Sequence, residues 1–180
     1  MRTAMHSAAL LSAALLGAAP AAHAIDLGPL AQAADGKVQC YVPNTVAKSC
    51  QSIGAYRITP AGAIENEATV MVSSSPLVIM TTHSLVQIKG GADCGVIREK
   101  DIASAHFTLE GQPAAPDRIA ALRAAMLGAM RPMFNHEICV FYRPQPDGLL
   151  ATTTVDAKPR PEMDQKVLWV SPADGWKVGF

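Results

Sequence analysis

Alternating apolar and polar residues dominate this chain and predict a mainly β protein. The clearest alternation covers 103–110, where Phe107 and Leu109 would face one side of a sheet and His106 and Thr108 the other. Shorter apolar runs predict further strands at 37–42, 55–59, 68–73, 77–80, 84–88, 137–142, 149–157, 166–170 and 176–180. Turn residues separate most of these runs, so we expect an antiparallel β-meander.

One segment has helical periodicity instead. Within 116–133, apolar residues recur every three or four positions, at Ile119, Leu122, Met126, Met130 and Met133. Alanine, the best helix former, fills much of the space between them. Pro116 suits the first helical position, and Pro132 is expected to end the helix. The sequence therefore predicts an α+β fold, a mainly antiparallel meander sheet with one packed α-helix over about 117–131.

The first 24 residues read as a secretory signal peptide. Arg2 precedes a short apolar stretch, and Ala22-His23-Ala24 forms a small-residue cleavage pattern. The stretch is shorter than the ~18–20 apolar residues that span a bilayer, and no later run is longer, so we expect no membrane-embedded segment. The segment 25–36 has a weak pattern and is expected to be a surface leader. Residues 37–180 then form a single globular domain in the periplasm or outside the cell.

The four cysteines, Cys40, Cys50, Cys94 and Cys139, all follow the expected cleavage site. An even number of cysteines in an exported chain predicts disulfides. Neither the C-x₂₋₄-C spacing of zinc sites nor a C-x-x-C redox pair occurs. Four cysteines allow three connectivities. Closure across the Pro43-Asn44 turn favours Cys40–Cys50, which leaves Cys94–Cys139.

Composition excludes some classes of function. Basic and acidic residues number 15 each, and no charge run is present, so the basic face of a nucleic-acid-binding protein is missing. Aromatic residues make up 5% of the chain, which disfavours stacking platforms for bases. The expected partner is another protein or a small ligand.

Methionine and histidine side chains suggest one metal hypothesis. Met126, Met130 and Met133 fall on the helical stripe, and His136 follows, a ligand set that suits Cu(I). Methionine also fills irregular space in cores, and we favour that interpretation. No metal and no cofactor are therefore expected.

Three histidines raise the possibility of an enzyme. His83, His106 or His136 could bind a metal or act as a base, for example toward Ser84 or Ser104. No nucleophile-elbow, phosphate-loop or zinc-protease motif supports this, because Val140 interrupts the H-E-x-x-H pattern that begins at His136. His106 lies on the polar side of its predicted strand and is expected to face solvent.

These observations favour an exported, disulfide-bonded, non-enzymatic binding or envelope accessory protein. The alternative is a small periplasmic hydrolase or metal-dependent enzyme that uses one of the three histidines. Export, size and disulfides favour the first hypothesis, although many functions share such folds.

Overall fold

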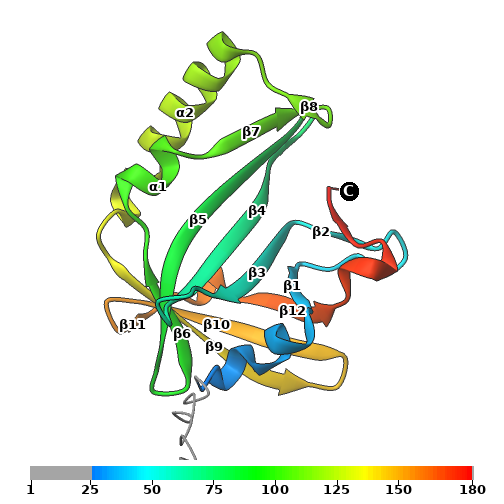
Figure 1. Cartoon of the computed structure of the whole chain (residues 1–180), viewed down its shortest axis with the longest axis vertical. Helices are drawn as coiled ribbons and strands as arrows, with labels where there is room; N and C mark the ends of the chain where they lie inside the picture. Colours follow the sequence, from blue (N-terminus) through cyan, green and yellow to red (C-terminus); the bar gives the residue numbers. More distant parts are fainter. Residues whose placement is uncertain (1–25, 180) are drawn as a thin grey trace, which may run out of the picture.

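The computed structural model describes residues 26–179, and the predicted signal peptide lies outside this range (Figure 1). The described chain is α+β, mostly antiparallel strand with few helices. The strands are β1 (Val38–Tyr41), β2 (Ser49–Cys50), β3 (Ser52–Ile58), β4 (Ile64–Ser74), β5 (Leu77–Lys89), β6 (Ala92–Val96), β7 (His106–Leu109), β8 (Gln112–Pro113), β9 (Glu137–Gln145), β10 (Gly148–Val155), β11 (Lys158–Pro159), β12 (Gln165–Val170) and β13 (Lys177–Val178). The α-helices are α1 (Glu99–Ala103) and α2 (Pro116–Met130), and the 3₁₀ helices are η1 (Gly28–Asp35), η2 (Arg131–Met133), η3 (Pro161–Met163) and η4 (Pro172–Asp174).

Eight strands close into a barrel, which corrects the predicted open meander. Their order is β4-β3-β1-β12-β10-β9-β6-β5, and β5 pairs back onto β4. The closing step that the sequence pattern misses is the antiparallel pairing of β1 with β12, in which Val38 lies opposite Val170. Closure satisfies the hydrogen-bonding groups that an open sheet would leave at its edges.

The β4–β5 hairpin extends beyond the barrel and carries the helices (Figure 1). Its far part pairs with β7, so that Val78 lies opposite Leu109 and Met80 opposite Phe107. Helix α2 packs there and matches the predicted helix within a residue at each end. The apolar cluster at this contact contains Val78, Met80, Ile102, Ala105, Phe107 and Ala114. None of the described helices is long and apolar enough to cross a membrane.

The strand predicted over 103–110 is only half correct. Residues 99–103 form the short helix α1, where the Asp101 carboxylate accepts a hydrogen bond from the Arg98 amide at 2.9 Å. The strand β7 begins at His106, which is exposed as expected, while Phe107 is buried. Ala103 favours a helix over a strand, and the capping contact between Arg98 and Asp101 supports the start of α1.

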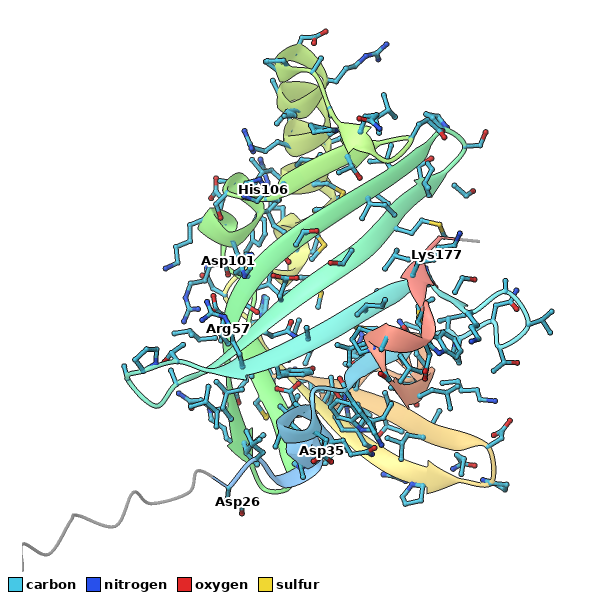
Figure 2. The ribbon with its side chains drawn as sticks, turned by 45° about the vertical axis from the view of Figure 1, so that its right-hand side comes forward. Asp26, Asp35, Arg57, Asp101, His106 and Lys177 are labelled. Carbon is cyan, nitrogen blue, oxygen red and sulfur yellow. A yellow bond between two sulfur atoms is a disulfide. The ribbon has the colours of Figure 1, made fainter. Side chains whose placement is uncertain are left out.

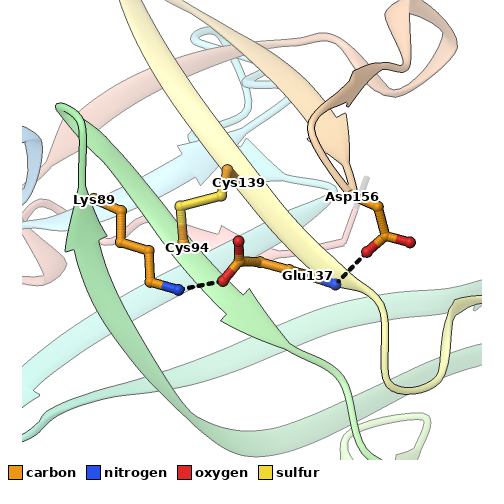
Figure 3. The surroundings of a disulfide bond; sticks show 5 residues. All are labelled: Lys89, Cys94, Glu137, Cys139 and Asp156. Atoms are coloured by element: carbon orange, nitrogen blue, oxygen red, sulfur yellow. Dashed lines mark hydrogen bonds and ion pairs between the residues drawn. A yellow bond between two sulfur atoms is a disulfide. The ribbon is translucent and has the colours of Figure 1, made fainter.

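Two disulfides stabilise the barrel, with the pairing that the short loop favoured. Cys40 bonds to Cys50, and Trp176 packs against this bond. Cys94 bonds to Cys139 across directly opposed positions of β6 and β9 (Figure 3). The chain-entropy model assigns about 3 kcal/mol to the shorter loop and about 4 kcal/mol to the longer one.

The predicted leader segment is part of the fold. Residues 28–35 form η1, a surface helix whose residues are exposed or half-buried except for Leu30, which is completely buried and anchors the segment. The helix contacts β3 and β6 and lies near one end of the barrel (Figure 1). Gly36 ends it in the left-handed conformation, with φ of 72°.

Candidate functional site

A buried polar cluster lies inside the barrel and contains all three tyrosines of the chain. The Gln39 carbonyl oxygen Oε1 lies 2.8 Å from the Tyr41 hydroxyl, 2.9 Å from that of Tyr56 and 3.1 Å from that of Tyr142. The Tyr41 and Tyr142 hydroxyls are 2.8 Å apart. Gln39 and Tyr41 share a face of β1 because side chains alternate along a strand. Cys40, between them, packs into the separate cluster around the first disulfide.

Asp93 extends this cluster from β6. Its Oδ2 accepts a hydrogen bond of 2.9 Å from the Tyr56 hydroxyl, and only 7% of the residue is exposed. Burial raises the pKa of Asp93 to about 6, and the hydrogen bond from Tyr56 opposes that rise. Among the described residues, no lysine, arginine or histidine forms an ion pair with this carboxyl group.

The surroundings also raise the pKa of each of the three tyrosines. Burial, reinforced by the charge of Asp93, raises the pKa of Tyr142 to about 12. Burial also raises the pKa of Tyr41 and of Tyr56 well above the ordinary tyrosine value. All three phenols are therefore neutral hydrogen-bond donors at physiological pH.

Two buried polar atoms of the cluster have no hydrogen-bond partner within the described chain. They are Nε2 of Gln39, a residue with no exposed surface, and Oδ1 of Asp93. Such groups cost about 1–3 kcal/mol each when nothing satisfies them. The cluster therefore contains two buried polar atoms that the described residues leave unsatisfied.

An apolar hollow adjoins the cluster beneath η1. Its volume is 240 Å³, and Tyr56 contributes to its wall. The other lining residues are Leu27, Ala33, Ala34, Arg57, Ile58 and Ile64. The ring of Tyr56 also lies 6.5 Å from that of Trp169. Tyr56 thus links the hollow to the hydroxyl cluster.

A wider hollow of 480 Å³ lies on the other side of Ile64. Its apolar wall includes Val86 and Ile88, and Asp26 borders it where the chain enters η1. Lys89 and Glu137 form an ion pair at its rim, beside the Cys94–Cys139 bond (Figure 3). Both hollows therefore share Ile64 in their walls and lie at the η1 end of the barrel.

No family model, no curated protein and no solved structure matches this chain. Any functional conclusion must therefore come from the geometry of this chain alone.

The three candidate histidines do not form a shared site with a serine. His83 lies between two glutamates of β4, 3.6 Å from Glu65 and 3.7 Å from Glu67. His106 (Figure 2) lies opposite Thr81, on the same outer face of the sheet as His83. Within the described chain, neither ring hydrogen-bonds to a serine hydroxyl.

His136 lies elsewhere, at the start of β9. Its Nδ1 is 2.6 Å from Asp156 Oδ2, and the other oxygen of Asp156 accepts the Glu137 amide at 3.0 Å. The hydrogen bond with His136 holds the pKa of Asp156 below its ordinary value. This exposed pair lies at the open end of the β9–β10 hairpin, away from the turn that joins the two strands.

The methionine stripe contributes to packing. Met126 and Met130 contact the apolar cluster between α2 and the β4–β5 hairpin, while Met133 belongs to η2. His136 interacts with Asp156 instead of joining them. Among residues 26–179, no group of three or more histidine, cysteine or acidic side chains is arranged to hold a metal ion.

Sequence reasoning missed the tyrosine cluster. Gln39, Tyr56, Asp93 and Tyr142 come from four different strands. The only local signal is the spacing of Gln39 and Tyr41, which places both on one face of a strand. This pair of hydrogen-bonding side chains on one face of a short strand is the cue that could have drawn attention to β1.

Proposed function

We propose that this chain is an exported, non-enzymatic binding protein that holds a small, mainly apolar ligand at the η1 end of its barrel. The observation that carries the proposal is the position of Tyr56. This residue lines the 240 Å³ hollow under η1, and its hydroxyl belongs to the buried cluster of Gln39 and Asp93.

Binding sites for small molecules combine apolar walls with a few fixed polar groups and often contain a residue of shifted pKa. The η1 end has these features in Ile58, Ile64, Tyr56 and Asp93. Eight-stranded antiparallel barrels are also wide enough to hold one small ligand. The hollow is smaller than the ~300–1,000 Å³ of typical drug-sized sites, so the ligand is expected to be compact.

Export is supported by the disulfides. Cys40–Cys50 and Cys94–Cys139 suit an oxidising environment outside the cytoplasm. The sequence prediction of a signal peptide points the same way. Periplasmic or secreted localisation is therefore part of the proposal.

Calorimetric titration with 1-naphthol tests the binding site, since this probe has an apolar body and one hydroxyl. We expect saturable binding to the mature protein. Ala33→Phe fills the hollow and should weaken binding by at least about tenfold. Ala31→Phe is the matched control, because Ala31 is an exposed residue of the same helix that does not line the hollow.

Thermal unfolding of both variants should show that each remains folded. Absence of saturable binding to the wild-type protein would refute the proposal. Equal loss of affinity in the two folded variants would place the probe outside the hollow and would refute it as well.

A further inference from the structure

The buried cluster contains more close oxygen pairs than its hydroxyl groups can satisfy. Five oxygen–oxygen contacts are present: three between tyrosine hydroxyls and Gln39 Oε1, one between Tyr41 and Tyr142, and one between Tyr56 and Asp93. Each hydroxyl carries one proton to donate. Three tyrosines therefore supply three protons for five contacts.

A proton on Asp93 reduces this deficit. The ionised carboxylate only accepts hydrogen bonds, whereas the protonated acid donates one. A protonated Asp93 can donate to the Tyr56 oxygen, which frees the Tyr56 proton for Gln39. Tyr56 is the one side-chain donor of the described residues that reaches the carboxyl group, and Oδ1 of Asp93 has no partner among them, so the site leaves an ionised carboxylate short of donors.

The groups around Asp93 offer no charge to compensate an anion. The titratable side chains that face it are the phenols Tyr41 on β1, Tyr56 on β3 and Tyr142 on β9. Apolar residues lie opposite it on the neighbouring strands, Ile88 on β5 and Val140 on β9.

The helix η1 also packs against β6 without supplying a counter-charge. Its one titratable residue is Asp35, which is acidic and exposed. Beyond the hydrogen bond from Tyr56, an ionised Asp93 can therefore gain stabilisation only from water that enters the barrel.

We infer that Asp93 is a proton-binding site that regulates the η1 end of the barrel, which closes when the proton is bound and opens to water when it is lost. As a regulation of the ligand site, this rests on the proposed function. Opening is expected at η1 because Tyr56 adjoins the hollow there, and because Leu30 is the one buried residue that holds this helix.

The direction of the pH dependence follows from the shifted pKa. In the closed protein burial raises the pKa of Asp93 from 3.8 to about 6, and in the hydrated open state the ordinary value returns. The closed form binds the proton more tightly than the open form. Proton binding therefore stabilises the closed form relative to the open form at acid pH, and this stabilisation is lost as the pH rises through about 6. From these two values, linkage gives an opening equilibrium about tenfold larger at about pH 7.5 than at about pH 5.

Amide hydrogen exchange of η1 measures this opening. After correction for the intrinsic exchange rate, protection at Leu30 and Gln32 should fall about tenfold between about pH 5 and about pH 7.5. In Asp93→Asn the amide cannot ionise, so protection should not change with pH. A pH-independent wild-type protein, or an Asp93→Asn variant that keeps the dependence, would overturn the inference.

Tyr56→Phe gives a second test if Asp93→Asn does not fold. Because the Tyr56 hydroxyl lowers the pKa of Asp93, its removal should move the midpoint of the exchange profile to higher pH. An unchanged or lower midpoint would contradict the role of Asp93.

Titration with 1-naphthol separates this inference from the proposed function. Tighter binding at about pH 5 than at about pH 7.5 supports both. Binding of equal strength at the two pH values refutes the regulation and leaves the ligand site standing. Absence of binding at either pH refutes the ligand site, while the exchange data still decide the role of Asp93.

Discussion

The glycine that begins β10 offers a sharp test of the packing between β10 and β12. Gly148 has φ of 139°, a value that other residues rarely adopt. A Cβ atom built at this position would lie 2.6 Å from Cδ2 of Leu168 and 2.8 Å from the carbonyl oxygen of Val167. The Leu168 side chain can rotate away. The Val167 carbonyl belongs to the backbone of β12 opposite Leu149 and cannot move without disturbing the barrel.

Gly148→Ala should therefore combine two penalties. A backbone conformation that side chains disfavour costs about 1–3 kcal/mol. Forcing an extra carbon into a tightly packed region costs about 1–3 kcal/mol more. We expect a total loss of about 3–5 kcal/mol in the free energy of unfolding, a large fraction of the ~5–15 kcal/mol that stabilises a typical domain.

Urea denaturation of three matched glycine variants measures the separate contributions. Gly175 also has a positive φ, of 84°, but a Cβ there meets nothing within 4 Å, so Gly175→Ala should cost only about 1–2 kcal/mol. Gly128 lies within α2 with the same open space, and Gly128→Ala should stabilise the protein by up to about 1 kcal/mol. If Gly148→Ala costs no more than Gly175→Ala, the steric argument fails.

Three further predictions concern the buried acid, the second disulfide and the helix. Asp93→Asn should raise the free energy of unfolding at about pH 7.5 by up to about 3 kcal/mol, the equivalent of the shift in pKa from 3.8 to about 6. The increase should be smaller at about pH 5, where the carboxyl group of the wild-type protein is mostly protonated. Urea denaturation at both pH values measures the effect, and an equal increase at both would contradict the prediction. Replacing Cys94 and Cys139 together by alanine should cost about 4 kcal/mol in the same assay, and full retention of stability would show that this bond does not constrain the unfolded chain. Met126→Ala should lower the free energy of unfolding by about 2 kcal/mol, near the lower end for core truncations, because this side chain is half-buried. A fully stable variant that loses Cu(I) affinity in a competition titration would favour the metal hypothesis instead.

The amino-acid sequence by itself determined most of the local structure. Alternation identified strands such as β9 and β12, since a half-buried strand must place apolar residues at every second position. The apolar stripe and the prolines at 116 and 132 located α2. The short loop across Pro43-Asn44 indicated the first disulfide, because nearby cysteines meet at little entropic cost.

Alternation of apolar and polar residues predicted the secondary structure less well where a segment also carries signals for a helix. Alternation over 103–110 predicted one strand, yet Ala103 ends α1 and the strand starts at His106. Small residues such as alanine carry little information about which face is buried, so the cap at Arg98 and Asp101 prevailed. The short strand β6 was missed because glycine and cysteine interrupt its apolar pattern.

Only the tertiary structure decided the closure of the barrel and the composition of its interior. Val38 pairs with Val170, and the hydroxyl of Tyr142 meets the amide of Gln39, a residue 103 positions earlier in the chain. Alternation shows which residues share a face of one strand, but it does not show which strand lies beside it or in what register. The cluster around Asp93 depends on the register of several strand pairs at once, and those registers are fixed by packing between segments that are remote in the sequence.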